Sequence, residues 1–337
     1  MFVIRQATMD DHATLMRLAK MLHFANVAAD PDEIARRISV SCDSFAGRIR
    51  EQRQRRFIFV LEDTDTGGVI GMSSIRSCVS RPGQPLTFLQ VRKRQHYSED
   101  LQTGHVHMTL QVAEDETEAS QLTGLVLSPP YRGHREKLGS FLSLVRFHFI
   151  GLQRAWFADA LVAKLTPPRT SNRWDSFWEQ LGRRFVNLRY AEAERFSHLS
   201  RQFITALFPQ GEIYVSLLPP EARNLIGKVG REEEPALAIL TKLGFAQTGR
   251  IDPFDGGPIL QANVADIPFI GRTRTATLGD PAKDHPLYGL VSISGGGRFR
   301  AVRSRYAESN GCISIPGDTA GLLGAHVSDT VGVTAVV

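Results

Sequence analysis

LTGLVLSPPYRGHREKLGSFLSLVRFHF, residues 122–149, decides the fold of this chain because it joins a strand to a helix through a charged loop. Leu122–Leu127 is apolar and is predicted to be a strand. It ends before Pro129 and Pro130, since proline has no N–H to donate to a sheet. Apolar side chains then recur on one stripe, and this spacing predicts a helix from about Ser140 to Gln153.

The loop between this strand and helix, Tyr131–Gly139, is a candidate anion-binding site. It carries Arg132, His134, Arg135 and Lys137 together with glycines. A helix N-terminus presents free N–H groups and the positive end of the helix dipole, and glycines let backbone approach a ligand. We assign the pyrophosphate of a coenzyme to this loop. The alternative is an ordinary strand–loop–helix with a solvated basic turn.

Composition and charge narrow the class of protein. The 337 residues are 42% hydrophobic and 22% charged, which is typical of a soluble globular protein of one large or two modest domains. No apolar run approaches the roughly 18 residues of a membrane span, and the N-terminus lacks the pattern of a secretory signal. The net charge of +5 is mild, without a basic stripe interleaved with aromatics. We therefore expect no nucleic-acid partner and no membrane partner.

The cysteines bear on location and on metal binding. Cys42, Cys78 and Cys312 are widely spaced and form no CxxC pair. This spacing argues against a disulfide framework or a zinc site, so we expect no metal. It also favours a reducing, cytoplasmic location.

The remaining chain is predicted from its periodicity and its turn residues. Helices are expected after Thr8 or Asp10 and after Asp30–Pro31, and over 174–181, Ala191–Leu207, Glu221–Ile226 and Pro235–Leu243. Strands are expected at Phe2–Ala7, Phe57–Glu62, Val69–Ile75, Val106–Val112, Ile213–Leu217, Phe245–Ile251 and Ile259–Val264. Residues 78–104 are predicted to be irregular because they are polar and contain Pro82, Gly83 and Pro85.

A change of composition near residue 272 divides the chain. From there it is rich in Gly, Ser and Val, with GGG at 295–297 and no helical periodicity. We predict a main domain over 1–271 and a small β-rich C-terminal extension over 272–337, which could cover a sheet edge of the main domain.

Seven segments, taken together and in order, carry a resemblance to a known family. They are FIFVLED (57–63), LTGLVLSPP (122–130), GSFLSLVRFHFI (139–150), SFWEQLGRRF (176–185), IGKV (226–229), EPALAILTKLGF (234–245) and IDPFDGGP (251–258). The set resembles the arginine N-succinyltransferase family, within the GCN5-related N-acyltransferase superfamily. The resemblance implies an α/β (α+β) fold with a twisted, mostly antiparallel sheet and helices on both faces.

The same resemblance implies an acyl-CoA site on the segment 122–149. Backbone groups near Leu125 would pair with the pantetheine arm, and the loop would take the pyrophosphate. Acyl-CoA, nominally succinyl-CoA, would be a co-substrate rather than a tightly bound cofactor. The implied site comprises Leu125, Val126, Leu127, Arg132, Gly133, His134, Arg135, Lys137, Gly139 and Ser140.

This chain departs from the family pattern in that loop. The superfamily loop runs Arg/Gln-x-x-Gly-x-Gly/Ala, whereas the register that ends at Gly139 places Lys137 at the middle glycine. Alternatively, Arg132 starts a longer loop. Lys137 could contact a phosphate as a point charge, or the phosphate cradle could be distorted.

A second departure concerns proton transfer. The family's proton-donating His corresponds to Gly230, and the superfamily's thiol-protonating Tyr corresponds to Leu240. Glu232, Glu233 or Glu234 could substitute if its pKa is raised. The alternative is that these glutamates only favour the first turn of the next helix. Tyr190, Tyr214 and His198 are further aromatic candidates for the missing acid.

Three other residues are candidates for binding the acceptor. Arg183 and Arg184 could hold a carboxylate in a bidentate manner. Asp255, in the turn DPFDGGP, could bind a cation, although a role in shaping the turn comes first. Trp178 is expected in the core.

We therefore expect a cytoplasmic N-acyltransferase that moves succinyl from succinyl-CoA to the α-amine of arginine or ornithine. One alternative is a weak or inactive acyl-CoA-binding paralogue or partner subunit, suggested by Gly230 and Leu240. Another is an N-acyltransferase with a different amine acceptor, suggested by the divergent residues 78–120. A homo- or hetero-oligomer is expected from the family.

Overall fold

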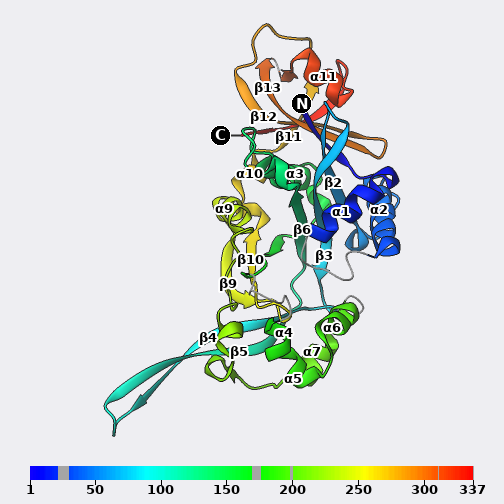
Figure 1. Cartoon of the computed structure of the whole chain (residues 1–337). Helices are drawn as coiled ribbons and strands as arrows, with labels where there is room; N and C mark the ends of the chain where they lie inside the picture. Colours follow the sequence, from blue (N-terminus) through cyan, green and yellow to red (C-terminus); the bar gives the residue numbers. More distant parts are fainter. Residues whose placement is uncertain (22–29, 169–175, 198–199, 310, 337) are drawn as a thin grey trace. The chain divides into compact units, whose positions relative to one another are not determined.

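The computed structural model describes residues 1–21, 30–168, 176–197, 200–309 and 311–336 (Figure 1). The chain forms two compact units, and each contains segments that are distant in sequence. Unit 1 comprises Met1–Cys78, Ala119–Leu161 and Asn263–Val337, and unit 2 comprises Val79–Glu118 and Val162–Ala262. The sequence-based boundary at residue 272 remains a prediction.

Unit 1 contains the strand–loop–helix segment. Its first strands follow the order β1-β2-β3-β6. Their bounds are β1 Phe2–Gln6, β2 Arg56–Asp63, β3 Gly68–Ser80 and β6 Ala119–Leu127. The helices are α1 His12–Met21, α2 Pro31–Phe45, α3 Leu138–Leu152 and α10 Pro268–Gly271. Strands β1, β2 and β3 pair antiparallel, as the sequence predicts for the hairpin of β2 and β3.

Alternation along β2 explains why helices lie on both faces of this sheet. Ile58 and Val60 belong to a core cluster with residues of α1 and α2. Phe57 and Phe59 contact the ring of Phe149 in α3, with centroids 4.8 and 5.4 Å away. Because successive side chains of a strand point to opposite faces, the apolar run of β2 buries both faces. The predicted sheet with helices on both faces is confirmed.

The β-rich C-terminal segment closes on itself. Its strands are β11 Arg274–Leu278, β12 Leu287–Gly295, β13 Arg298–Ser309, β14 Cys312–Ser314 and β15 Thr330–Ala335, with helix α11 at Gly317–Leu323. The order β12-β15-β11-β14-β13 is completed by pairing of β13 with β12, so the five strands form a ring, which we call the C-terminal barrel. Closure removes the free edges that strands otherwise expose.

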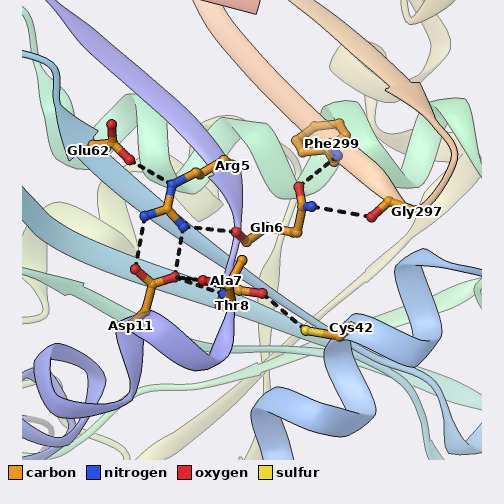
Figure 2. Close-up of polar contacts among 9 residues, drawn as sticks. All are labelled: Arg5, Gln6, Ala7, Thr8, Asp11, Cys42, Glu62, Gly297 and Phe299. Atoms are coloured by element: carbon orange, nitrogen blue, oxygen red, sulfur yellow. Dashed lines mark hydrogen bonds and ion pairs between the residues drawn. The ribbon is translucent and has the colours of Figure 1, made fainter. Parts of the chain in front are cut away.

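The C-terminal barrel joins the sheet of unit 1 through β1. Strand β13 pairs antiparallel with β1, with Ile4 opposite Ala301. The side-chain amide of Gln6 extends this junction (Figure 2), because it donates to Gly297 O at 3.2 Å and accepts from Phe299 N at 2.7 Å. The barrel therefore covers the edge of β1, as the sequence analysis suggested for the extension.

The strands of unit 2 follow the order β7-β10-β9-β4-β5-β8. Its strands are β4 Leu86–Ser98, β5 Thr103–Asp115, β7 Ala160–Lys164, β8 Ile213–Tyr214, β9 Ala246–Ile251 and β10 Pro258–Asn263. Its helices are α4 Ser176–Gln180, α5 Gly182–Val186, α6 Tyr190–Ser197, α7 Gln202–Leu207, α8 Pro220–Arg223 and α9 Glu234–Lys242. Among the described residues of both units, no helix is long and apolar enough to cross a membrane.

Two of the recognised segments pack against each other in unit 2. The Trp178 ring stacks on that of Phe254 at 4.8 Å, and Trp178 is fully buried, as predicted. A Cβ at Gly256, where φ is +77°, would lie 3.1 Å from the Phe177 ring, and one at Gly257 would lie 2.2 Å from Leu165 O. Both glycines are therefore required by close packing, which explains the FDGGP turn in structural terms.

Some sequence predictions are corrected. The prediction that residues 78–104 are irregular is wrong: β4 runs from Leu86 to Ser98 and pairs along its whole length with β5 (Figure 1). Its outer half is exposed on both faces, so no apolar alternation marks it. The single helix predicted over Ala191–Leu207 is two helices, α6 and α7, and Ser200 Oγ accepts from Gln202 N at 3.1 Å before the second. The predicted helix start at Trp174 lies outside the described residues.

Candidate functional site

The end of β6 forms one wall of the predicted acyl-CoA site. Gly124 has φ +65°, a left-handed conformation that favours glycine, and a Cβ there would lie 2.9 Å from Ser74 Oγ. Ser74 Oγ donates to Thr123 O at 3.2 Å. This irregularity directly precedes Leu125, Val126 and Leu127, of which only Val126 is fully buried. A glycine in this conformation inside a strand is typical of a bulge or of a close approach of another group to the backbone.

The start of α3 provides open hydrogen-bond donors. The first intrahelical bond runs from Phe141 N to Lys137 O at 3.1 Å. The N–H groups of Leu138, Gly139 and Ser140 precede it and have no partner within the helix. No side chain caps this helix end. The predicted anion site thus has the donor arrangement that an anion requires.

Lys137 occupies the residue position just before α3 in a left-handed conformation, with φ 49° and ψ 50°. A glycine adopts these angles freely, whereas a side chain with a Cβ is strained there. This agrees with the register in which Lys137 stands at the family's middle glycine. The loop keeps the backbone shape that the glycine would allow, although its residue type differs.

The other loop residues form a basic surface around these donors. Arg132, Gly133 and Arg135 are exposed. Arg132 donates from Nε to Leu127 O at 3.2 Å, which ties the loop back to β6. The His134 ring packs edge-on against Phe2 at 5.2 Å and its Nδ1 accepts from Glu136 N at 3.3 Å. Here the structure brings together the residues predicted to bind the coenzyme.

The sequence analysis missed Arg303, a residue of β13 in the C-terminal barrel. Arg303 Nη1 donates to Glu136 O at 2.9 Å and to Lys137 O at 3.3 Å, and Nη2 donates to Ser140 Oγ at 3.1 Å. Its guanidinium lies over the Phe141 ring at 5.2 Å. No local sequence signal points to this contact, because Arg303 is 166 residues away from Lys137.

A second polar centre lies in unit 2, at the turn between β9 and β10. Asp252 Oδ1 accepts from Phe254 N at 2.9 Å, and Asp255 Oδ1 accepts from Gly257 N at 2.7 Å. Gly227 N donates to Gly256 O at 2.9 Å, which joins the IGKV segment to the turn. Asp255 is therefore a turn-forming residue, and its side chain is buried.

Buried charges surround this turn; we call Lys164, Glu194, Arg201, Asp252 and Asp255 the buried charge cluster. Lys164, which ends β7, donates from Nζ to Asp252 Oδ2 at 2.5 Å, and Arg201 Nη1 lies 3.7 Å from the same oxygen. Glu194 Oε2 and Arg201 Nη1 are buried without a hydrogen-bond partner among the described residues. A lone lysine that closes the apolar strand ALVAK is the one sequence signal for this cluster.

The three acids of the cluster titrate differently. Burial alone would raise the pKa of Asp252, but Lys164 and Arg201 outweigh it and lower the pKa to about 2. Burial and the Asp252 charge raise the pKa of Asp255 to about 8. The same two causes raise the pKa of Glu194 to about 7. Groups that exchange protons near neutral pH suit acid–base chemistry.

The glutamates predicted near Gly230 lie at the start of α9. Glu232 and Glu234 are exposed, and Glu233 accepts from Thr166 Oγ1 at 3.3 Å. Gly230 itself is tightly enclosed, since its N–H donates to Thr166 O at 2.9 Å and a Cβ would lie 2.9 Å from Pro167 O. A histidine at residue 230 would require the backbone to shift.

The other predicted acceptor residues are held locally. Arg183 and Arg184 are exposed on α5 and hydrogen-bond to Glu179 at 2.5 Å and to Gln180 at 3.4 Å. Leu240 is buried. The aromatic candidates do not meet at one point: Tyr190 packs on Phe254, Tyr214 bonds to His96 Nε2 at 3.3 Å, and His198 lies outside the described residues.

Comparison with known proteins connects this geometry to a family. The family model described as "Arginine N-succinyltransferase beta subunit" matches residues 2–269. The chain is 32% identical over 307 residues to an arginine N-succinyltransferase of Enterobacter sp. (strain 638), covering 90% of this chain and 88% of that protein. It is 31% identical over 337 residues to one of Escherichia coli (strain 55989 / EAEC), covering 98% and 96%.

A solved structure is similar over nearly its whole length. It is named the arginine/ornithine succinyltransferase subunit AI from Pseudomonas aeruginosa. The TM-score is 0.81 at 27% identity, and the match covers 99% of this chain and 98% of that one. The similarity includes the C-terminal barrel, which the family model does not cover.

Proposed function

Because the chain belongs to the arginine N-succinyltransferase family, we propose that it transfers succinyl from succinyl-CoA to the α-amine of arginine or ornithine. The observation that carries this proposal is the strand–loop–helix of unit 1. There, three N–H donors at the uncapped start of α3 stand beside basic loop residues. That arrangement suits the pyrophosphate of an acyl-CoA.

The proposed acyl-CoA site uses residues of β6, the loop and α3. The pantetheine amides pair with backbone groups of Leu125, Val126 and Leu127. The pyrophosphate binds the N–H groups of Gly139 and Ser140. The side chains of Arg132, His134, Arg135 and Lys137 and the backbone of Gly133 complete the cradle. The left-handed Gly124 supports this assignment, because a glycine inside a strand often marks a bulge or a place where a ligand approaches the backbone closely.

The chemistry asks little more than positioning and proton transfer. A neutral amine attacks the thioester carbonyl, the oxyanion is stabilised by backbone N–H groups of β6, and the C–S bond breaks to release CoA. Overall, an ammonium and a thioester become an amide, a thiol and one proton. The reaction therefore requires a group that accepts the ammonium proton.

Asp255, a buried acid whose charge changes near neutral pH, is the proposed partner of the acceptor's cation. Arg183 and Arg184 are the proposed partners of the acceptor carboxylate. Glu232, Glu233 and Glu234 remain proposed alternatives for the base.

Incubation of the purified chain with succinyl-CoA and a panel of amines tests the proposal. We expect free CoA thiol to appear with arginine or ornithine and not without an acceptor. Acetyl-CoA in parallel tests the choice of acyl group. Arg135→Ala in the loop should raise the KM for succinyl-CoA several-fold, and Arg305→Ala, an exposed arginine of β13, should not. If no amine stimulates thiol release, the chain is not this transferase.

A specific observation favours a second function. Gly230 and Leu240 stand where the family has its two proton donors. The backbone around Gly230 leaves no space for a larger side chain, and Leu240 is buried. The alternative is an acyl-CoA-binding subunit that assembles with an active partner. Calorimetry with CoA separates the two, because tight binding without turnover, even with the panel of amines, supports the subunit. A different amine acceptor would appear as turnover outside arginine and ornithine.

A further inference from the structure

The loop before α3 carries an unusual residue for its backbone shape. Lys137 has φ 49°, in the left-handed region where a Cβ crowds the backbone. A strained residue persists only where its surroundings over-determine its conformation. The contacts that fix Lys137 therefore matter for the shape of the loop.

Within the loop itself, few contacts hold this conformation. Lys137 N donates to His134 O at 2.8 Å, and Lys137 O accepts from Phe141 N at 3.1 Å. The latter bond is the first of α3 and would form with any residue here. Neither bond explains why a lysine stays left-handed at the helix start.

Arg303 supplies the missing constraint from the C-terminal barrel. Its Nη1 spans two consecutive carbonyls, Glu136 O and Lys137 O, which lie on either side of the strained residue. Its Nη2 reaches Ser140 Oγ in the first turn of α3. The rigid, planar guanidinium thereby fixes the orientation of both peptide groups around Lys137.

The orientation of these peptides decides what the loop offers to a ligand. In a trans peptide, the C=O and the following N–H point in opposite directions. When Lys137 O faces Arg303 and the helix, Leu138 N–H faces outward from the helix start. The N–H groups of Gly139 and Ser140, which follow it, have no partner within the helix.

The platform that carries Arg303 is itself fixed to α3. His148, fully buried in α3, bonds from Nδ1 to Thr334 Oγ1 of β15 at 2.6 Å and from Nε2 to Ser292 Oγ of β12 at 2.7 Å. A Cβ at Gly151 would lie 2.5 Å from Thr273, and one at Gly332 would lie 2.6 Å from Leu152. The barrel and α3 are in close contact, and these contacts constrain the position of Arg303 relative to the loop.

We propose that Arg303 is a positioning residue for acyl-CoA binding, which holds Lys137 in the left-handed conformation that a glycine would adopt unaided. This rests on the proposed function, because it assumes that the loop binds the pyrophosphate of CoA. The C-terminal barrel is then part of the binding machinery: it compensates, from across the sequence, for the glycine that the loop lacks. A chain with glycine at residue 137 would not depend on Arg303.

The test compares Arg303→Ala in two backgrounds, the natural chain and Lys137→Gly. Calorimetry with CoA measures Kd, and steady-state kinetics measure the KM for succinyl-CoA and for the acceptor separately. We expect Arg303→Ala to raise Kd and the KM for succinyl-CoA about ten-fold in the natural chain, with the KM for the acceptor unchanged. In the Lys137→Gly background, the same change should cost less than about two-fold.

Controls separate this role from folding and from a direct contact. Arg305→Ala, two residues along the same strand and exposed, should leave Kd unchanged. Arg303→Lys keeps the charge but loses the two-carbonyl geometry, so it should behave as Arg303→Ala. A full effect of Arg303→Ala in both backgrounds would overturn the proposal, since it would mean that Arg303 acts on the ligand directly. So would wild-type affinity of Arg303→Ala.

Failure of the proposed function gives a different result. If the natural chain does not bind CoA, the loop's function is wrong, yet the conformational claim can still be measured. Lys137→Gly should then raise the thermal midpoint less in Arg303→Ala than in the natural chain, because Lys137 without Arg303 leaves the left-handed conformation and has less strain for the glycine to relieve. Equal shifts in both backgrounds would refute the coupling.

Discussion

The loop before α3 and the turn between β9 and β10 are both glycine-containing and rich in charge, but they hold that charge differently. The loop of unit 1 is exposed, and its donors are backbone N–H groups and basic side chains without buried counter-charges. The turn of unit 2 buries its acids and compensates one of them with Lys164 and Arg201. An exposed loop of donors is suited to bind an anion that the ligand brings. A buried cluster is suited to exchange protons.

This difference predicts opposite responses to substitution. Changes in the loop should alter ligand affinity and, apart from the strain that Lys137→Gly relieves, leave the free energy of unfolding nearly unchanged. Changes in the buried charge cluster should alter the free energy of unfolding and its dependence on pH, because desolvated charges depend on their partners. Substitutions in the loop and in the buried charge cluster therefore test the difference separately.

The largest effect is expected from Asp252→Asn. The substitution removes the carboxylate that pairs with Lys164 and Arg201, and removal of one partner of a buried ion pair costs about 3–5 kcal/mol of unfolding free energy. Urea unfolding of the full chain measures it. Arg183→Ala, which removes an exposed pair with Glu179, is the matched control and should cost no more than about 1 kcal/mol. A loss as small as the control's would show that the cluster is hydrated rather than desolvated.

A smaller effect, on pH dependence, is expected from Asp255→Asn. Because the folded-state pKa of Asp255 is raised to about 8, above its unfolded value, the folded chain binds the proton more tightly. The stability from this group is fully present below about pH 4 and is lost as pH rises through about 8. Between these two pH values the contribution of this group falls by up to about 1.4 kcal/mol for each pH unit. Unfolding of both chains at pH 5, 6.5 and 8 should show a flatter profile for Asp255→Asn; parallel profiles would contradict it.

How much of this could be predicted from sequence depends on how local the signal is. The segment 122–149 was predictable because prolines end the strand and apolar residues mark the helix within one stretch. The turn at Asp252–Gly257 was predictable because its proline and glycines also lie within one short stretch. Strand β4 was not, because the outer half of its hairpin exposes both faces, so Arg92–Ser98 carries no alternation.

The functional contacts that sequence reasoning missed are all distant in the chain. Arg303 reaches the loop only because five strands close into a barrel, and closure depends on pairings such as that of Leu287 with Tyr306. Lys164 and Glu194 break the rule that charges lie at the surface, so composition predicts them as exposed. Gly230 and Gly139 look alike in sequence, yet only one of them has space for a side chain.

The last comparison makes the same substitution, Gly→Ala, once in each unit. The smallest change in unfolding free energy is expected for the substitution in unit 1. In unit 2, Gly230→Ala places a Cβ 2.9 Å from Pro167 O and should cost about 1–3 kcal/mol. In unit 1, a Cβ at Gly139 meets nothing within 4 Å, and alanine is a better helix former than glycine. Gly139→Ala should therefore leave the free energy of unfolding within about 0.5 kcal/mol of the natural chain or slightly raise it.

Gly139→Ala should weaken the binding of acyl-CoA even though it leaves stability intact. A Cα–Cβ bond in a helix tilts toward the N-terminus, so the added methyl group at Gly139 leans toward the open N–H groups where the pyrophosphate is proposed to bind. We expect the Kd for CoA to rise several-fold in Gly139→Ala, measured by calorimetry on a chain whose stability is intact. Unchanged affinity would mean that no ligand approaches this backbone. The open donors at the start of α3 would then be solvated, as the simpler interpretation of this basic turn holds.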